Sequence, residues 1–107
     1  MGTRTLIAAA LLSLTGCPGP RPSVNDAQVR PSPLPGRYRV EATVDNRSRG
    51  EGQVDVRIQL RDRRTGHTVE ADRDLQVHGH EQAHLTADIE APPGEYDAQV
   101  EAEYPPE

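Results

Sequence analysis

The 107-residue chain has few aromatic residues and almost no cysteine. Three tyrosines are its only aromatics, because tryptophan and phenylalanine are both absent. A hydrophobic core must therefore be built from valine, isoleucine, leucine and alanine, and we expect it to be thin. Cys17 is the only cysteine, so no disulfide within the chain can reinforce that core.

Lysine is also absent, and all 12 basic residues are arginines. Their distribution is uneven: residues 30–64 hold nine arginines and five acidic residues, whereas residues 65–107 hold one arginine and eleven acidic residues. Proteins that bind nucleic acid concentrate basic side chains on one face to meet the phosphates. The acidic second half therefore argues against nucleic acid as a partner.

Long hydrophobic runs are missing as well. The main apolar segment covers residues 6–14 and is interrupted only by Ser13, whereas a helix needs about 20 apolar residues to cross a bilayer. Arg4 places a positive charge before this segment, and small residues follow it. This is the layout of an export signal, so we interpret residues 1–16 as a targeting segment.

The residues that end this segment are Leu14, Thr15, Gly16 and Cys17. They resemble the lipobox of bacterial lipoproteins, which consists of an aliphatic residue, a small residue, glycine or alanine, and cysteine. The resemblance covers about the first 17 residues. It implies that the signal is cut before Cys17, that the thiol and the new amino terminus are acylated, and that Pro18 directs a Gram-negative lipoprotein to the outer membrane. More than one acyl chain holds a protein stably at a membrane.

Two other interpretations of Cys17 stay open. An ordinary secretory signal, cut a few residues after Cys17, would release a soluble domain. A nucleophilic thiol is disfavoured, because no histidine lies near Cys17 in the sequence to act as a base. The lipobox interpretation predicts the cell envelope as location and the membrane as a partner.

Proline dominates residues 17–36, at positions 18, 20, 22, 31, 33 and 35. Because proline fixes φ and lacks an N–H group, we interpret this segment as a semi-extended linker. At about 3.1 Å per residue it would reach up to roughly 60 Å from the lipid. Within it, only Ala27-Gln28-Val29 suggests a short edge strand.

Residues 37–107 show the two-residue alternation of half-buried strands. Polar turns separate the alternating segments, and no helical period appears. This pattern predicts an all-β domain, a small antiparallel immunoglobulin-like sandwich of about six to seven strands. One segment, residues 69–77, is either one bent strand or two short ones. The expected strands cover residues 37–44, 54–60, 69–77, 83–89 and 96–104.

The same region resembles the immunoglobulin-like and fibronectin-like accessory modules of bacterial surface proteins, including FxLYD-type domains. The resemblance rests on the segments 44–46, 56–62, 65–66 and 79–81, although the Phe and Leu-Tyr that define the FxLYD type are missing. Residues 93–96, Pro-Gly-Glu-Tyr, resemble the corner where such domains tie the backbone with a tyrosine hydroxyl. The resemblance implies a sandwich fold and an accessory role.

His78, His80 and His84 are the candidate metal ligands, with His67 as a further candidate. Imidazoles bind zinc and copper, and residues two apart on a strand point to the same side. Val77 and Ala83 are expected to point inward, which places His78 and His84 outward. Gly79 marks a turn that disturbs this geometry, so solvated turn histidines are the favoured interpretation.

Glu95, Asp97, Glu101 and Glu103 form an acidic stripe on the outward face of the last expected strand. Such a stripe suits a basic partner or divalent ions. The alternative is pairing with Arg37, Arg39 or Arg57 on neighbouring strands, and we favour this alternative.

No combination of nucleophile, base and orienting group is recognisable, so we expect no enzyme and no cofactor. The expected function is that of a lipid-anchored cell-envelope protein with a structural or protein-interaction role. Its partner would be an envelope protein or a cell-wall component. The alternative is a periplasmic zinc- or copper-binding module that uses the turn with His78, His80 and His84.

Overall fold

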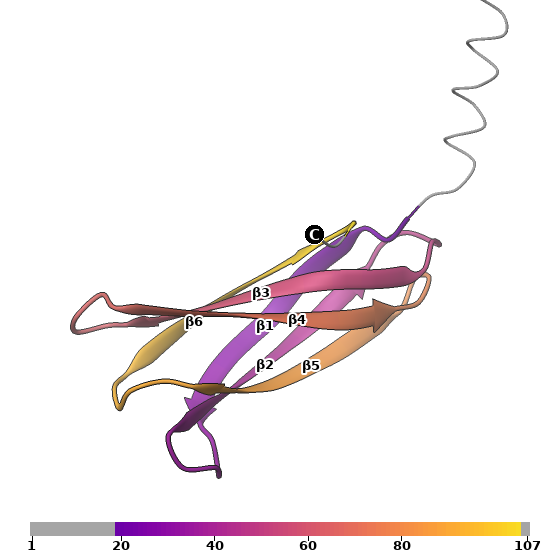
Figure 1. Cartoon of the computed structure of the whole chain (residues 1–107). Coiled ribbons are helices and arrows are strands. Elements are labelled where there is room, and N and C mark those ends of the chain that lie inside the picture. The colour runs from indigo at the N-terminus through magenta and orange to yellow at the C-terminus, as the bar shows by residue number, and fades with distance from the viewer. Residues whose placement is uncertain (1–18, 106–107) are drawn as a thin grey trace, which may run out of the picture.

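The computed structural model describes residues 19–105, and these form six strands in two three-stranded antiparallel sheets (Figure 1). The sheet orders are β1-β2-β5 and β4-β3-β6. The predicted all-β sandwich is thus confirmed. The strands are β1 (Pro22–Pro31), β2 (Arg37–Asn46), β3 (Gly52–Asp62), β4 (Thr68–Val77), β5 (Gln82–Glu90) and β6 (Tyr96–Glu103).

Strand β1 lies within the segment that we expected to be a linker. It pairs with β2 from Pro22 opposite Asn46 to Pro31 opposite Tyr38. Its two prolines stand at its ends, on an edge strand, where a missing N–H group interrupts no central ladder. The pairing shifts between Asn25 and Gln28. The folded domain therefore begins before residue 37, and the expected edge strand at residues 27–29 is part of a ten-residue strand.

The remaining strands follow the alternation in the sequence. Strand β4 is one continuous strand of ten residues, which settles the two alternatives for residues 69–77. Strand β3 occupies the centre of its sheet and pairs with β4 and β6 along its length. Because alternate side chains of a strand point to opposite faces, each sheet has one face in the core and one in solvent.

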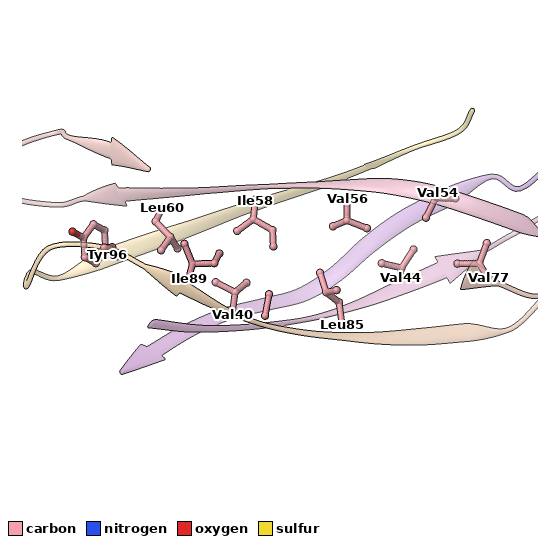
Figure 2. Close-up of a cluster of buried hydrophobic side chains, with 12 residues drawn as sticks. Val40, Val44, Val54, Val56, Ile58, Leu60, Val77, Leu85, Ile89 and Tyr96 are labelled. Atoms are coloured by element: carbon pink, nitrogen blue, oxygen red, sulfur yellow. The ribbon is translucent and has the colours of Figure 1, made fainter. Parts of the chain in front are cut away.

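The core is aliphatic, as the composition predicts (Figure 2). Four side chains of β3 are at most 1% exposed and point at the opposite sheet. Burial of a side chain of this size contributes about 1.5–3 kcal/mol before the cost of ordering it. The β3 residues are Val54, Val56, Ile58 and Leu60, and they face Val40, Val44, Leu85 and Ile89.

A tyrosine corner closes the connection between β5 and β6, as predicted. The Tyr96 hydroxyl donates a hydrogen bond to the Pro92 carbonyl at 2.6 Å, and burial raises the pKa of Tyr96. The Tyr38 ring packs edge-on against Tyr96, with centroids 4.8 Å apart. The Tyr38 hydroxyl accepts a hydrogen bond from the Gly94 N–H at 3.0 Å. Two of the three tyrosines are thus used to fix one turn.

The strand order matches part of an immunoglobulin-like sandwich. In that fold, strands A, B and E belong to one sheet and strands C′, C, F and G to the other, and the tyrosine corner precedes F. Here β1-β2-β5 corresponds to A-B-E and β4-β3-β6 to C′-C-F. Residues 19–105 contain no counterpart of strand G, so β6 is an edge strand.

Candidate functional site

The two ends of the sandwich differ in which connections they carry (Figure 1). The proximal end consists of residues 19–21, the β2–β3 loop (47–51), the β4–β5 turn (78–81) and residues 104–105. The distal end carries the other three connections. The predicted lipobox residues Leu14, Thr15, Gly16 and Cys17 lie outside the described residues. They precede the proximal end directly in the sequence.

Asn46 joins the segments of the proximal end. Its side chain is buried, with 3% of the residue exposed. Its Oδ1 accepts hydrogen bonds from the N–H groups of Arg21 at 3.0 Å and Ser48 at 3.1 Å. Its Nδ2 donates to the carbonyls of Gly50 at 2.7 Å and His78 at 2.8 Å. One amide therefore ties the start of the domain to the loop and the turn.

The loop and the turn are also packed backbone to backbone. The His80 N–H donates to the Ser48 carbonyl at 2.9 Å, and His80 has a φ of 55°. A Cβ atom at Gly79 would collide with the carbonyl of Arg49. Glycine is therefore required at this position by close approach of the two segments.

The three candidate histidines do not converge. His78 and His80 lie in the β4–β5 turn, and the Nδ1 of His78 is 3.2 Å from Glu51. His84 lies on β5, where its Nδ1 is 3.2 Å from the Thr43 hydroxyl. His78 and His84 are exposed, as expected. Within residues 19–105, no group of three or more His, Cys, Asp or Glu side chains is placed to hold a metal ion.

Three exposed arginines gather at the proximal end. The Arg47 N–H donates to the Arg21 carbonyl at 3.1 Å, which places these two residues side by side, and Arg49 follows in the same loop. Acidic side chains at this end include Glu51, which contacts His78, and exposed Glu81. The proximal end is therefore strongly charged but of mixed sign.

The predicted acidic stripe on β6 is partly paired. Asp97 accepts from Arg63 at 2.7 Å, and Glu103 lies 4.0 Å from Arg57. The predicted partners Arg37 and Arg39 are too far away, because β2 belongs to the other sheet. The register makes Glu101 the cross-strand neighbour of Arg57.

Arg39 has its partner within its own sheet. Its Nε lies 3.0 Å from Asp88 on β5, and this hydrogen bond holds the pKa of Asp88 below its ordinary value. The neighbouring pair of Arg30 and Glu41 joins β1 to β2. On the outer face of β1-β2-β5, basic and acidic side chains therefore alternate and pair.

The edge strands β1 and β6 lie close together, although no ladder joins them. The aliphatic side chains along this side pack against the core but stay partly exposed: Val24, Val29, Ala98, Val100 and Ala102. One hollow opens at the proximal end of the two strands, between Pro22 and Tyr104, and another at their distal end, between Val29 and Glu95. The two sheets therefore approach each other along this side, with a hollow at each end.

No family model and no curated protein matches the chain. Among solved structures, the fold is similar to the crystal structure of a DUF1425 family member from Shewanella sp. pv-4. The TM-score is 0.57 and the sequence identity 20%, over 77% of this chain and 76% of that chain. At this identity the similarity supports the β-sandwich fold alone. No helix that could span a membrane occurs in residues 19–105.

Sequence reasoning missed both the role of Asn46 and the close approach of β1 to β6. The pattern Asn-x-Ser-x-Gly at the end of an alternating strand is a signal for side-chain capping of a loop, so Asn46 was recognisable in principle. The approach of β1 to β6 was not, because it depends on which strands become the edges of the two sheets.

Proposed function

We propose that this protein is a lipid-anchored component of the bacterial cell envelope and that its sandwich serves in protein interaction. The observation that carries the proposal is the short spacing between the lipobox-like motif and the fold. Arg21, which hydrogen-bonds to Asn46, comes four residues after Cys17. Four residues span at most about 14 Å. Acylation of Cys17 would therefore place the proximal end next to the lipid headgroups.

The interaction role is supported by the surfaces that such an anchor leaves free. The outer face of the sheet β4-β3-β6, which carries the acidic side chains of β6, runs along the sandwich from the proximal to the distal end. The resemblance to FxLYD-type accessory modules agrees with such a role. The histidines offer no comparable support for metal binding, since His84 lies on a different surface from His78 and His80.

Membrane fractionation and intact mass measurement test the anchor. The wild-type chain is expected in the membrane fraction, cut before Cys17 and carrying added acyl mass. The Cys17→Ser chain should carry no acyl mass, and its mature form should be absent from the membrane fraction. A wild-type chain that is secreted without acyl groups would refute the anchor.

Crosslinking tests the interaction role. Cells that carry C-terminally tagged wild-type chain should yield a defined envelope component on affinity recovery, and cells with the Cys17→Ser chain should yield less of it. Recovery of no envelope component from an acylated wild-type chain would contradict the interaction role while leaving the anchor intact.

A further inference from the structure

The proximal end carries three exposed arginines whose side chains the fold does not use. Arg21 and Arg47 take part in it through backbone atoms, because the Arg21 N–H donates to Asn46 at 3.0 Å and the Arg47 N–H donates to the Arg21 carbonyl at 3.1 Å. Arg49 lies in the same loop as Arg47. None of the ion pairs within residues 19–105 involves the guanidinium groups of these three residues. Their charges are therefore available to a ligand.

The basic residues of the distal end are more often matched by acidic ones. Arg63 is held by Asp97 at 2.7 Å. Arg37 stands opposite Glu90 in the register of β2 and β5. Arg64 is exposed and forms no ion pair within the described residues. Unmatched arginine side chains are therefore concentrated at the proximal end.

Two carboxylates of the proximal end oppose these charges. Glu51 has a hydrogen-bonding neighbour in the fold, since it lies 3.2 Å from the Nδ1 of His78. Glu81 is exposed in the β4–β5 turn. Most other carboxylates lie along the strands, and salt screens charges that are more than about 8 Å from a surface. The proximal end thus keeps a positive excess, although the net charge of the chain is -5.

An exposed tyrosine lies at the same end. Tyr104 is 43% exposed, and a Cβ atom at Gly19 would collide with its ring, so the ring covers the first described residue. A partly exposed tyrosine is amphipathic and favours the headgroup level of a bilayer. Arginine presents a planar set of donors that matches phosphate. Arginine and tyrosine together fit the chemistry of a phospholipid headgroup layer.

We propose that the proximal end binds the anionic headgroups of a phospholipid bilayer through Arg21, Arg47 and Arg49, with Tyr104 at the level of the headgroups. Basic side chains are attracted by the negative potential of such a surface and donate charge-assisted hydrogen bonds to phosphate. The inference rests on the anchored role proposed above for its setting in the cell. The contact itself requires no acyl group, so it can be tested separately.

An acidic protein is a poorer occupant of this end. Arg21 comes four residues after Cys17, and four residues span at most about 14 Å. A lipid attached to Cys17 would leave little room for a protein between the bilayer and the proximal end. The arginines would also determine how the anchored sandwich stands, because they lie on two segments that meet at the backbone bond between Arg47 and Arg21.

Vesicle binding by an unacylated chain tests this proposal. The chain consists of residues 17–107 with Cys17→Ser, so it has no site for acylation. The vesicles contain either phosphatidylcholine alone or equal parts of phosphatidylcholine and anionic phosphatidylglycerol. We expect partitioning into the mixed vesicles to be at least about tenfold higher at low salt, measured by sedimentation. Salt at about 1 M should remove the difference, because the Debye length falls to about 3 Å.

Single substitutions identify the contact. Arg21→Gln, Arg47→Gln and Arg49→Gln should each lower partitioning into the mixed vesicles about fivefold. Arg64→Gln removes the same charge from an exposed position at the distal end, and should change partitioning by less than about twofold. Glu81→Gln should raise partitioning about threefold, because it removes an opposing charge. Thermal melts of these variants check that each sandwich is still folded.

Several results would overturn the proposal. Equal losses in Arg64→Gln and in the proximal variants would mean attraction by overall charge. Equal partitioning into both kinds of vesicle, or none into either, would refute contact with anionic lipid. If the wild type is acylated in cells but its unacylated form ignores anionic vesicles, the anchor stands and this inference fails. If the unacylated form binds them but the wild type carries no acyl mass, the anchor fails and the contact stands.

Discussion

Asn46 uses all of its hydrogen-bonding capacity to hold the proximal end together. Two backbone N–H groups and two carbonyls depend on its amide, and 3% of the residue is exposed. Asn46→Ala leaves these groups without a partner in a region that water reaches poorly. We expect the free energy of unfolding to fall by about 2–4 kcal/mol, measured by urea denaturation.

Asn25→Ala is the matched control for this prediction. Asn25 donates one exposed hydrogen bond, to Asp45, so its removal should change the free energy of unfolding by less than about 0.5 kcal/mol. Asn46→Asp keeps the accepting oxygen and loses the two donated bonds, and an intermediate effect is expected. Equal effects of the two alanine variants would contradict the role of Asn46.

The phenol of Tyr96 makes the stability of the fold decrease at alkaline pH. Burial raises the pKa of its phenol above the ordinary value of 10.0, so the folded state favours the protonated form. Its contribution is complete below that ordinary value and is lost as the pH rises through the pKa of the folded state. Tyr96→Phe should lower the melting temperature by about 5 °C at neutral pH, because the bond to Pro92 is lost.

The same variant should weaken the alkaline decline in the melting temperature between about pH 9 and pH 11. Tyr104→Phe is the control, because Tyr104 is 43% exposed. It should leave both the neutral melting temperature and the alkaline decline unchanged. If the melting temperature of Tyr96→Phe falls as steeply at alkaline pH as that of the wild type, the decline must be due to another titrating group.

At the level of the strands, the sequence predicted those with strict alternation and missed the one without it. Aliphatic residues alternate with polar ones at positions 40–44 of β2 and 54–60 of β3, so the inward faces of these strands were recognisable. Strand β1 has prolines at both ends and an irregular pairing. Its strand conformation is fixed by pairing with β2 and is not indicated by a hydrophobic alternation of its own. Ion pairs between strands could not be predicted either. The sequence does not show that Arg39 and Asp88 are neighbours until the register of β2 and β5 is known.

Arg73 lies on the edge strand β4 opposite Val56, at a register position that points inward, yet Arg73 is exposed. An inward-pointing charge on an edge strand prevents edge-to-edge association. We expect Arg73→Leu to change the free energy of unfolding by less than about 1 kcal/mol but to increase aggregation on heating, measured by light scattering. Arg61→Leu places the same exposed side chain on the outer face of the central strand β3, and should aggregate less. Equal aggregation of the two variants would show that exposed leucine is sufficient, wherever it lies.

For the whole molecule, the position of the fold relative to the proposed anchor determines its orientation. Strands of ten residues at about 3.3 Å per residue place the distal end about 33 Å beyond the proximal end. If Cys17 is acylated as proposed, the short spacing from Cys17 to Arg21 would keep the proximal end near the lipid. An acylated protein should therefore stand with its β-strands pointing away from the membrane.

Fluorophores at opposite ends of the acylated protein test this orientation in zwitterionic vesicles that carry a headgroup quencher. Glu81→Cys labels the β4–β5 turn and Arg64→Cys labels the distal β3–β4 turn, both at exposed positions. We expect strong quenching at residue 81 and little at residue 64, because contact quenching fails over the length of a strand. Insertion of twelve glycine and serine residues after Pro18 should abolish most of the difference, since about 20 Å of flexible chain then separates the fold from the lipid. Equal quenching at both ends of the protein without the insertion would mean that the sandwich lies flat on the membrane.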